Sequence, residues 1–270
     1  MSAATLAVAL GACGCATLNY TDPAAPLYSG GVGRVQAPDG FVRIVTYNIR
    51  FAERVGPAIE QLRRSPLAGA DIMALQEMDV AGVAQIASAL GMHYVYYPSA
   101  IHPKSKRDFG NAILSPWPVE VPRKLVLPHR GAIVNQLRTA TVATVRVAGR
   151  PLLVYSIHLG PPPATSGAGR RAQIEVILED AAGSPDPVVI LGDFNSRDAA
   201  RLVAFRGYEW LTRDVGPTLK RFGHPLEFDH ILVRGLAGDA QASAGVVRDG
   251  SKASDHSPVW ARLRLEPAAP

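Results

Sequence analysis

The stretch Val188-Val189-Ile190-Leu191-Gly192-Asp193-Phe194-Asn195 decides how the rest of the chain is interpreted. Four apolar residues in a row predict a strand that is buried on both faces, and the glycine after them predicts a tight turn. An acid and an amide directly past a buried strand are costly for folding but suited to holding a hard divalent cation. The stretch therefore predicts a core strand that delivers Asp193 and Asn195 to a functional site.

Four further motifs carry acids, amides and histidines. They are Thr46-Tyr47-Asn48, Leu75-Gln76-Glu77, Phe228-Asp229-His230 and Ser254-Asp255-His256-Ser257-Pro258. The first two follow the apolar runs 42–47 and 72–75, so they also stand where a buried strand is expected to end. One such motif could be a simple turn. Five of them in one chain indicate a site that carries chemistry.

Length and composition indicate one enzyme-sized domain. The chain has 270 residues, of which 47% are hydrophobic, and this is enough for a substantial core. The formal net charge of +5 and the pI near 9.4 are compatible with an anionic substrate, such as nucleic acid or an anionic lipid headgroup, but do not require one.

The patterns of apolar residues predict a mixture of strands and helices. Helices are expected at 55–64, 80–90 and 170–182, where apolar residues recur at helical spacing. Strands are expected at 41–49, 72–76, 94–97, 111–114, 136–147, 152–158, 188–191, 231–233 and 259–265.

The N-terminal segment has the composition of an export signal. Both cysteines lie in residues 1–16, where the stretch 6–16 is apolar but too short to span a membrane. Leu10-Gly11-Ala12-Cys13 looks like a bacterial lipoprotein processing box, although no Lys or Arg precedes the apolar region. The alternative is a segment without a targeting role. We expect a secretory or lipoprotein-type leader at 1–16, a Pro/Gly-rich tether at 17–40 and the folded domain at 41–266.

The residue composition of these motifs and their order along the chain resemble those of the endonuclease/exonuclease/phosphatase superfamily of metal-dependent phosphoesterases. Further matches are Phe109-Gly110-Asn111-Ala112-Ile113-Leu114-Ser115 and Tyr155-Ser156-Ile157-His158-Leu159. The resemblance spans roughly residues 41–265. It implies an α/β (α+β) fold in which two packed mixed β-sheets are flanked by helices, a four-layer sandwich.

The resemblance implies a metal site at Glu77. The matching glutamate of the family binds the metal, with support from the residues that match Asn48 and Asp255. Ligands that offer only oxygen suit Mg²⁺ or Mn²⁺. Taken alone, Glu77 could instead be an acid that stabilises the N-terminus of the helix beginning at Val80.

The resemblance also implies the catalytic groups. Asp193 would orient or deprotonate the attacking water, and Asn195 would contact the scissile phosphate. Asp229 would pair with His256, because an imidazole oriented by a carboxylate is a good acid/base group near neutral pH. His158 matches a second histidine of the deoxyribonuclease-like and sphingomyelinase-like branches, which is often assigned as general acid.

Several residues are predicted with less specific roles. Asn111 would hydrogen-bond the phosphate or the catalytic histidines, and Arg138 would clamp a phosphate oxygen unless it is a surface arginine. His230 is expected to be structural. Arg50 replaces the acid that abasic-site enzymes carry two positions after the motif asparagine, and together with His158 this points away from a DNA-repair enzyme.

Three functions remain open. The first is a Mg²⁺-dependent phosphodiesterase acting outside the cytoplasm as a monomeric nuclease, either periplasmic, anchored to a membrane or secreted. The second applies the same chemistry to a phospholipid or phosphoinositide headgroup, which a lipid anchor at Cys13 would bring close. The third is a non-catalytic surface lipoprotein, ranked last because Glu77, Asp193 and His256 are all present.

Overall fold

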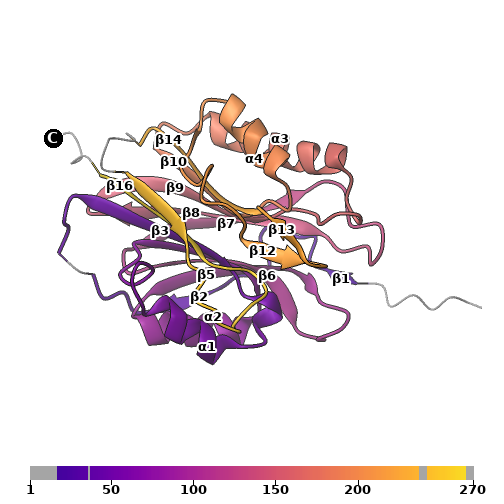
Figure 1. Ribbon diagram of the computed structural model, residues 1–270, viewed down its shortest axis with the longest axis horizontal. Coiled ribbons are helices and arrows are strands. Elements are labelled where there is room, and N and C mark those ends of the chain that lie inside the picture. The colour runs from indigo at the N-terminus through magenta and orange to yellow at the C-terminus, as the bar shows by residue number, and fades with distance from the viewer. Residues whose placement is uncertain (1–16, 36, 237–241, 266–270) are drawn as a thin grey trace, which may run out of the picture.

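The computed structural model describes residues 17–35, 37–236 and 242–265. Two β-sheets pack face to face, and helices cover the outer face of each sheet (Figure 1). Helices α1 and α2 lie on one side and α3 and α4 on the other, so the layers run helices, sheet, sheet, helices (Figure 1). This is the four-layer α/β (α+β) sandwich that the resemblance implies, and it confirms that prediction.

The first sheet contains strands from both ends of the chain, in the order β1-β5-β6-β4-β3-β16-β15, with β2 also paired to β5. Strands β3 and β4 run parallel, connected by the short helix η1 (Arg50–Ala52) and by α1 (Val55–Leu62). Helix α2 (Val80–Leu90) begins at Asp79, whose side chain accepts a hydrogen bond from the Gly82 amide, and ends at a left-handed Gly91. The strands are β1 (Leu18–Asn19), β2 (Tyr28–Gly31), β3 (Phe41–Asn48), β4 (Ile72–Met78), β5 (His93–Ile101), β6 (Asp108–Ser115), β15 (Ser243–Val246) and β16 (Val259–Arg264).

The second sheet has the order β11-β14-β10-β9-β8-β7. Strands β9 and β10 run parallel, connected by α3 (Gly167–Ala182), and α4 (Arg197–Phe205) follows β10. Strands β12 (Leu219–Arg221) and β13 (His224–Leu226) form a separate small hairpin. The strands of the sheet are β7 (Val119–Leu127), β8 (Arg138–Val147), β9 (Arg150–His158), β10 (Val188–Asp193), β11 (Glu209–Trp210) and β14 (Asp229–Arg234).

The pairing registers decide where the functional site lies. In the second sheet Asp193 stands opposite both His158 and Asp229. In the first sheet Asn48 is the last residue of β3 and is paired with Gln76, one residue before Glu77. Strand pairing therefore brings these residues together within each sheet, and packing of the sheets brings Asn48 near residues as far along the chain as Asp229, 181 positions away (229 − 48).

Three apolar clusters fill the spaces between the four layers. Val42, Ile44, Val154 and Val189 belong to the cluster between the two sheets and are fully buried. A second cluster packs α1 and α2 against the first sheet, and a third packs α3 and α4 against the second sheet. The core strand predicted at 188–191 is buried along its whole length.

The structure corrects the prediction that residues 17–40 form a tether outside the fold. Leu18 pairs with Ile101 and Tyr28 pairs with Tyr96, so this segment adds two short strands to the edge of the first sheet. The Pro/Gly-rich composition did not reveal this because edge pairing uses backbone groups rather than an apolar pattern. The leader at 1–16, with Cys13, lies outside the described residues. Among those that are described, no helix has the length and hydropathy needed to cross a membrane.

Candidate active site

Glu77 is held in an unusual backbone conformation. The pairing of β4 with β6 shifts register between Leu75 and Met78, and Glu77 at this bulge has a φ of 57°. A non-glycine residue in the left-handed region costs about 1 to 3 kcal/mol, and such strain concentrates at functional sites. The carboxylate accepts hydrogen bonds from the Asn48 amide (3.2 Å) and from the Phe51 backbone N–H (3.2 Å). The strained bulge thus presents Glu77 to the space between the two sheets.

Asn48 links the acids of the two sheets. Its Nδ2 donates both to Glu77 and to Asp193 Oδ2, the latter at 3.0 Å. Its Oδ1 accepts the Arg50 backbone N–H at 3.0 Å. A side chain with both ends engaged in this way fixes the positions of the two carboxylates.

Asp193 is the last residue of β10, and Asn195 lies two residues beyond the end of this strand. Gly192 is required there, because its φ is 144° and a Cβ atom would lie 2.0 Å from the Ile157 carbonyl oxygen. The Asn195 backbone N–H donates to Asp193 Oδ1 (2.8 Å), and its side-chain amide donates to the Leu159 carbonyl (3.0 Å). Burial raises the pKa of Asp193, whereas the charge of a protonated imidazole nearby opposes this rise.

His256 is oriented by Asp229, as the resemblance implied. Its Nδ1 lies 2.8 Å from Asp229 Oδ2, an oxygen that also accepts the Thr218 hydroxyl. The other ring nitrogen lies 3.8 Å from Asp193 Oδ2. Burial alone would lower the pKa of His256, but the carboxylates of Asp229, Asp193 and Asp255 outweigh it and raise the pKa to about 10. The imidazole is therefore a cation at neutral pH.

His158 has the opposite electrostatic character. Arg138 Nη1 lies 3.1 Å from His158 Nδ1, and because a guanidinium only donates, the ring proton resides on Nε2. This Nε2 lies 3.4 Å from Asp193 Oδ2 and 4.0 Å from Glu77 Oε1. Burial, then Arg138 and His256, lower the pKa of His158 well below its usual value. A neutral His158 is suited to donating a hydrogen bond, and less suited to the general-acid role expected for it.

A cleft of about 350 Å³ opens onto these groups. Asn48 and Asp229 stand behind its wall and hold the residues in front of them. The predicted residues that line the cleft are Glu77, Arg138, His158, Asp193, Asn195, Asp255 and His256. Arg138 is only 7% exposed, so the alternative of a surface arginine is wrong.

The cleft also contains residues that the motifs did not single out. Rings of Phe51, His102 and Phe109 pack together, with centroids 4.4 to 5.8 Å apart. Lys220 and Arg221 of the β12–β13 hairpin form another part of the wall. The matches at Phe109 and directly after Asn48 were the available signals for the aromatic residues, and nothing in the sequence marked the hairpin.

Asn111 does not line the cleft. Its side-chain amide donates to the Thr139 backbone carbonyl (2.7 Å), and the backbone carbonyl of Asn111 accepts the Thr141 hydroxyl (2.7 Å). Both bonds run from β6 of the first sheet to β8 of the second. The geometry favours a structural role for Asn111, which joins the two sheets by hydrogen bonds, over the phosphate contact expected for it.

The donor set fits a hard divalent cation. Glu77 and Asp255 line the same cleft. Burial raises the pKa of the Glu77 carboxyl, His256, Arg138 and Asn48 lower it, and repulsion from the Asp255 carboxylate adds to the rise. A cation between them would relieve this repulsion, and carboxylate oxygens are what Mg²⁺ binds. Ligand atoms of Asp193, Asp229 and His256 also lie within 4.8 Å of one another. Within that group His256 is hydrogen-bonded to Asp229, and its other ring nitrogen lies 3.8 Å from Asp193 Oδ2.

The fold and the site together define a class of hydrolase that acts on phosphate esters. The model of the Endonuclease/Exonuclease/phosphatase family matches residues 45–256. The chain belongs to this family, whose members are metal-dependent phosphoesterases.

Solved structures share the fold at low sequence identity. The endonuclease/exonuclease/phosphatase from Beutenbergia cavernae is 20% identical, with a TM-score of 0.66 over 84% of this chain and 72% of that one. Sphingomyelinase C from Streptomyces griseocarneus is 20% identical, with a TM-score of 0.63 over 83% and 99%. Humanized D. rerio TDP2 is 17% identical, with a TM-score of 0.64 over 84% and 100%. No curated protein sequence matches this chain.

Proposed function

We propose that this protein is a Mg²⁺-dependent phosphodiester hydrolase, with Mn²⁺ able to replace Mg²⁺, and that its substrate is a nucleic acid outside the cytoplasm. One observation carries the chemistry: Asn48 holds an acid from each sheet at a single cleft that also contains the cationic imidazole of His256. A separate ion site on a surface loop would not bring a base, an acid and a ligand set together in this way.

Glu77 and Asp255 would hold the ion, and Asn48 would keep Glu77 in place. When bound, the ion would polarise a phosphate oxygen and lower the pKa of a water molecule. The remaining chemistry belongs to the side chains of the cleft.

Asp193 would accept the proton of the attacking water as its oxygen forms a bond to phosphorus. His256 would protonate the departing oxygen as its bond to phosphorus breaks, and Asp229 would stabilise the imidazolium beforehand. The Nε2–H of His158 and the buried guanidinium of Arg138 would stabilise charge on the phosphate oxygens.

The wall of the cleft supports a nucleic-acid substrate. Lys220 and Arg221 offer positive charge to a phosphate backbone, and both are exposed. The rings of Phe51 and Phe109, with centroids 5.8 Å apart, offer apolar faces on which bases can stack.

A lipid headgroup is the second candidate, and one observation favours it. Phe222, at the turn of the β12–β13 hairpin beside the cleft, is 90% exposed. Leu18 and Ile133 are 60% and 72% exposed, and the segments that carry them are joined by the bond from the Asn19 amide to the Asn135 carbonyl (2.8 Å). Such apolar side chains could enter a membrane surface. Trp117 lies at the opposite end of the first sheet, where its indole donates to Asp71.

The test is hydrolysis of four substrates by the chain from Thr17 onward, which keeps β1 and β2. Plasmid DNA, RNA, sphingomyelin and an inositol polyphosphate are compared with Mg²⁺ and with EDTA. We expect Mg²⁺-dependent nicking of DNA, reduced roughly a hundredfold or more by Asp193→Asn and by His256→Ala. Asp198→Asn, at an exposed acid, is the control.

Each outcome distinguishes between the candidates. Activity on sphingomyelin alone would replace the nucleic acid by the lipid. Near-normal turnover in either variant would contradict the roles given to Asp193 and His256. Absence of hydrolysis of all four substrates would contradict the nucleic-acid proposal and would favour a surface protein that binds a partner without turnover.

We also propose that the protein is exported as a monomer and that Cys13 carries a lipid anchor. The support is the sequence of residues 1–16 alone. Full-length protein made in a bacterium fed labelled palmitate should incorporate the label in the wild type and in Cys15→Ala. Equal labelling of Cys13→Ala would exclude the anchor, and light scattering of the purified protein would check the monomer.

A further inference from the structure

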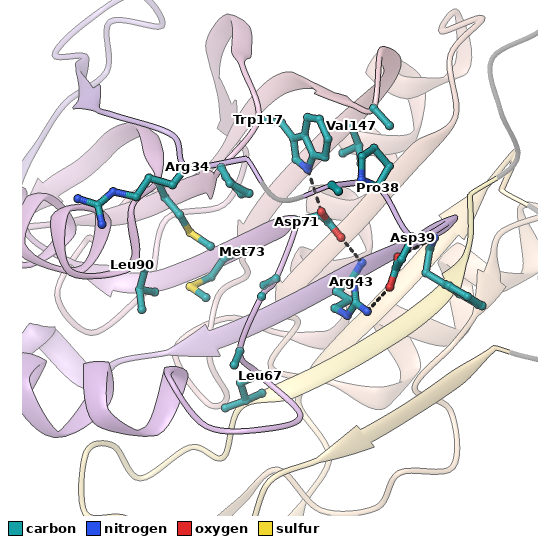
Figure 2. A pocket seen from close by; sticks show the side chains of 18 of the residues that line it. Arg34, Pro38, Asp39, Arg43, Leu67, Asp71, Met73, Leu90, Trp117 and Val147 are labelled. Atoms are coloured by element: carbon teal, nitrogen blue, oxygen red, sulfur yellow. Dashed lines mark hydrogen bonds and ion pairs between the residues drawn. The ribbon is translucent and has the colours of Figure 1, made fainter.

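A second and larger cavity, of about 820 Å³, lies away from the catalytic cleft (Figure 2). Phe41 and Asp71, which line it, stand at the beginning of the parallel strands β3 and β4, whereas Asn48 and Glu77 stand near their ends. The cavity therefore occupies the opposite end of the first sheet. No residue of the catalytic cleft contributes to it. Its volume is within the range of about 300 to 1,000 Å³ typical of ligand sites.

Apolar side chains form much of the lining. Leu67, Met73 and Leu90, the last residue of α2, line one part of the cavity, and Trp117 and Val147 stand together in another part (Figure 2). Methionine adapts its shape to a flexible ligand more readily than branched residues do. The lining suits a long hydrocarbon chain.

The polar groups at the Trp117 end are already bonded to one another. The half-buried carboxylate of Asp71 accepts hydrogen bonds from the Trp117 indole (2.8 Å) and from the Arg43 backbone N–H (2.8 Å). The Arg43 guanidinium pairs with Asp39 (Figure 2). A ligand would gain little by presenting polar groups here, because these donors and acceptors have partners.

The charge of the lining favours an anion at the end of the cavity near Arg34, away from Trp117. Four arginines line the cavity, at positions 34, 43, 63 and 150, against two aspartates, at 39 and 71. Within the part of the chain that is described, the Arg34 guanidinium has no hydrogen bond or ion pair. It extends from the rim away from Asp71 and Trp117 (Figure 2). Val32 and Val35, close to Arg34 in the chain, are 76% and 50% exposed.

We propose that this cavity binds a single acyl chain ending in an anionic group. The chain lies along Met73 and Leu90 toward Trp117, and the anionic group binds the guanidinium of Arg34. A free fatty acid and a lysophospholipid share this chemistry. The cavity thus supplies the protein with a lipid-binding site that is separate from catalysis.

The measurement uses Trp117 as a reporter in the full-length protein. Stearate brominated in mid-chain quenches a tryptophan that it contacts, so titration should give saturable quenching. Trp117→Phe should remove that saturable component while Trp210 and Trp260 remain. Unbrominated stearate and lysophosphatidic acid are competitors, and their relative affinities identify the source of the ligand. Monoolein, an uncharged monoacyl lipid, should compete at least about tenfold more weakly.

A pair of arginine variants tests the anionic contact. Arg34→Glu should weaken stearate binding about tenfold or more, whereas Arg171→Glu, on an exposed position of α3, should leave it unchanged. Hydrolysis of the preferred phosphodiester should be unaffected in both. Absence of saturable quenching, equal quenching in Trp117→Phe, equal competition by monoolein or unchanged binding by Arg34→Glu would each overturn the proposal.

Discussion

The buried histidine His230 should make the fold sensitive to acid. Its ring lies edge-on to Phe194 and Trp210, with centroid distances of 5.4 and 5.0 Å, and it is 1% exposed. Nε2 donates to the Glu227 carbonyl at 3.1 Å, and among the described residues Nδ1 has no partner. Burial lowers the pKa of His230 to about 3, so the ring is neutral in the native state.

The sign and size of the effect follow from the two pKa values. In the unfolded chain the imidazole has its ordinary pKa of about 6.5, so below that pH the unfolded state binds a proton that the native state does not. Stability is therefore lost as the pH falls from about 6.5 toward 3. Between pH 7 and pH 5 the loss is about 2 kcal/mol, because the pH then lies about 1.5 below the unfolded value.

The assay is urea unfolding at pH 7 and pH 5. We compare the wild type with His230→Gln, which keeps a donor for the Glu227 carbonyl but does not titrate, and with His224→Gln at an exposed position. The wild type and the His224 variant should each lose about 2 kcal/mol more than His230→Gln on acidification. Other buried acids contribute equally to all three proteins. Equal losses in the wild type and His230→Gln would refute the reasoning.

Three further predictions concern the metal site, the contact between the sheets and the glycine at position 192 in β10. Saturating Mg²⁺ should raise the melting temperature, by the equivalent of about 3 kcal/mol at a hundredfold excess over Kd, and Glu77→Gln should abolish the shift seen by calorimetry. Asn111→Ala should lower the unfolding free energy by about 1 to 3 kcal/mol in urea, since it leaves a buried carbonyl unpaired; an unchanged midpoint would contradict this. Gly192→Ala should cost about 3 kcal/mol or more, because its Cβ would meet the Ile157 carbonyl, whereas Gly183→Ala meets nothing and should be tolerated, as circular dichroism melts would show.

The elements that could be predicted are those whose signals are local. The prediction for α2 is confirmed at both ends, because Asp79 and Gly91 mark its caps as clearly as its apolar face marks its length. The cleft residues at strand ends were recognisable for a similar reason, since a polar residue directly after a buried apolar run stands out. Strand bounds were short by a few residues where the pairing continues into polar positions such as Asp193.

The elements that could not be predicted depend on pairing and on the third dimension. Strand β7 contains Pro122 and several charged residues, so its sequence has no apolar alternation, and only its pairing with β8 makes it a strand. Asn111 belongs to a motif, but its position in β6 turns its amide toward the other sheet. The tether was misjudged because two short strands at a sheet edge need little beyond free backbone groups.

The hydrogen-bonded pairs at the cleft are shared between the two sheets, and this has a consequence for how the enzyme would lose activity. Asn48 reaches from the first sheet to Asp193 in the second, and His256, just before β16, reaches to Asp229 in β14. A slip of one sheet over the other by about 1 Å would misplace all of these groups at once, and such a displacement can cost about a hundredfold in rate. The turnover rate should therefore respond to small shifts of one sheet relative to the other. On warming, or after a cavity-forming change in the core at Val189, activity should fade while both sheets still keep their hydrogen bonds.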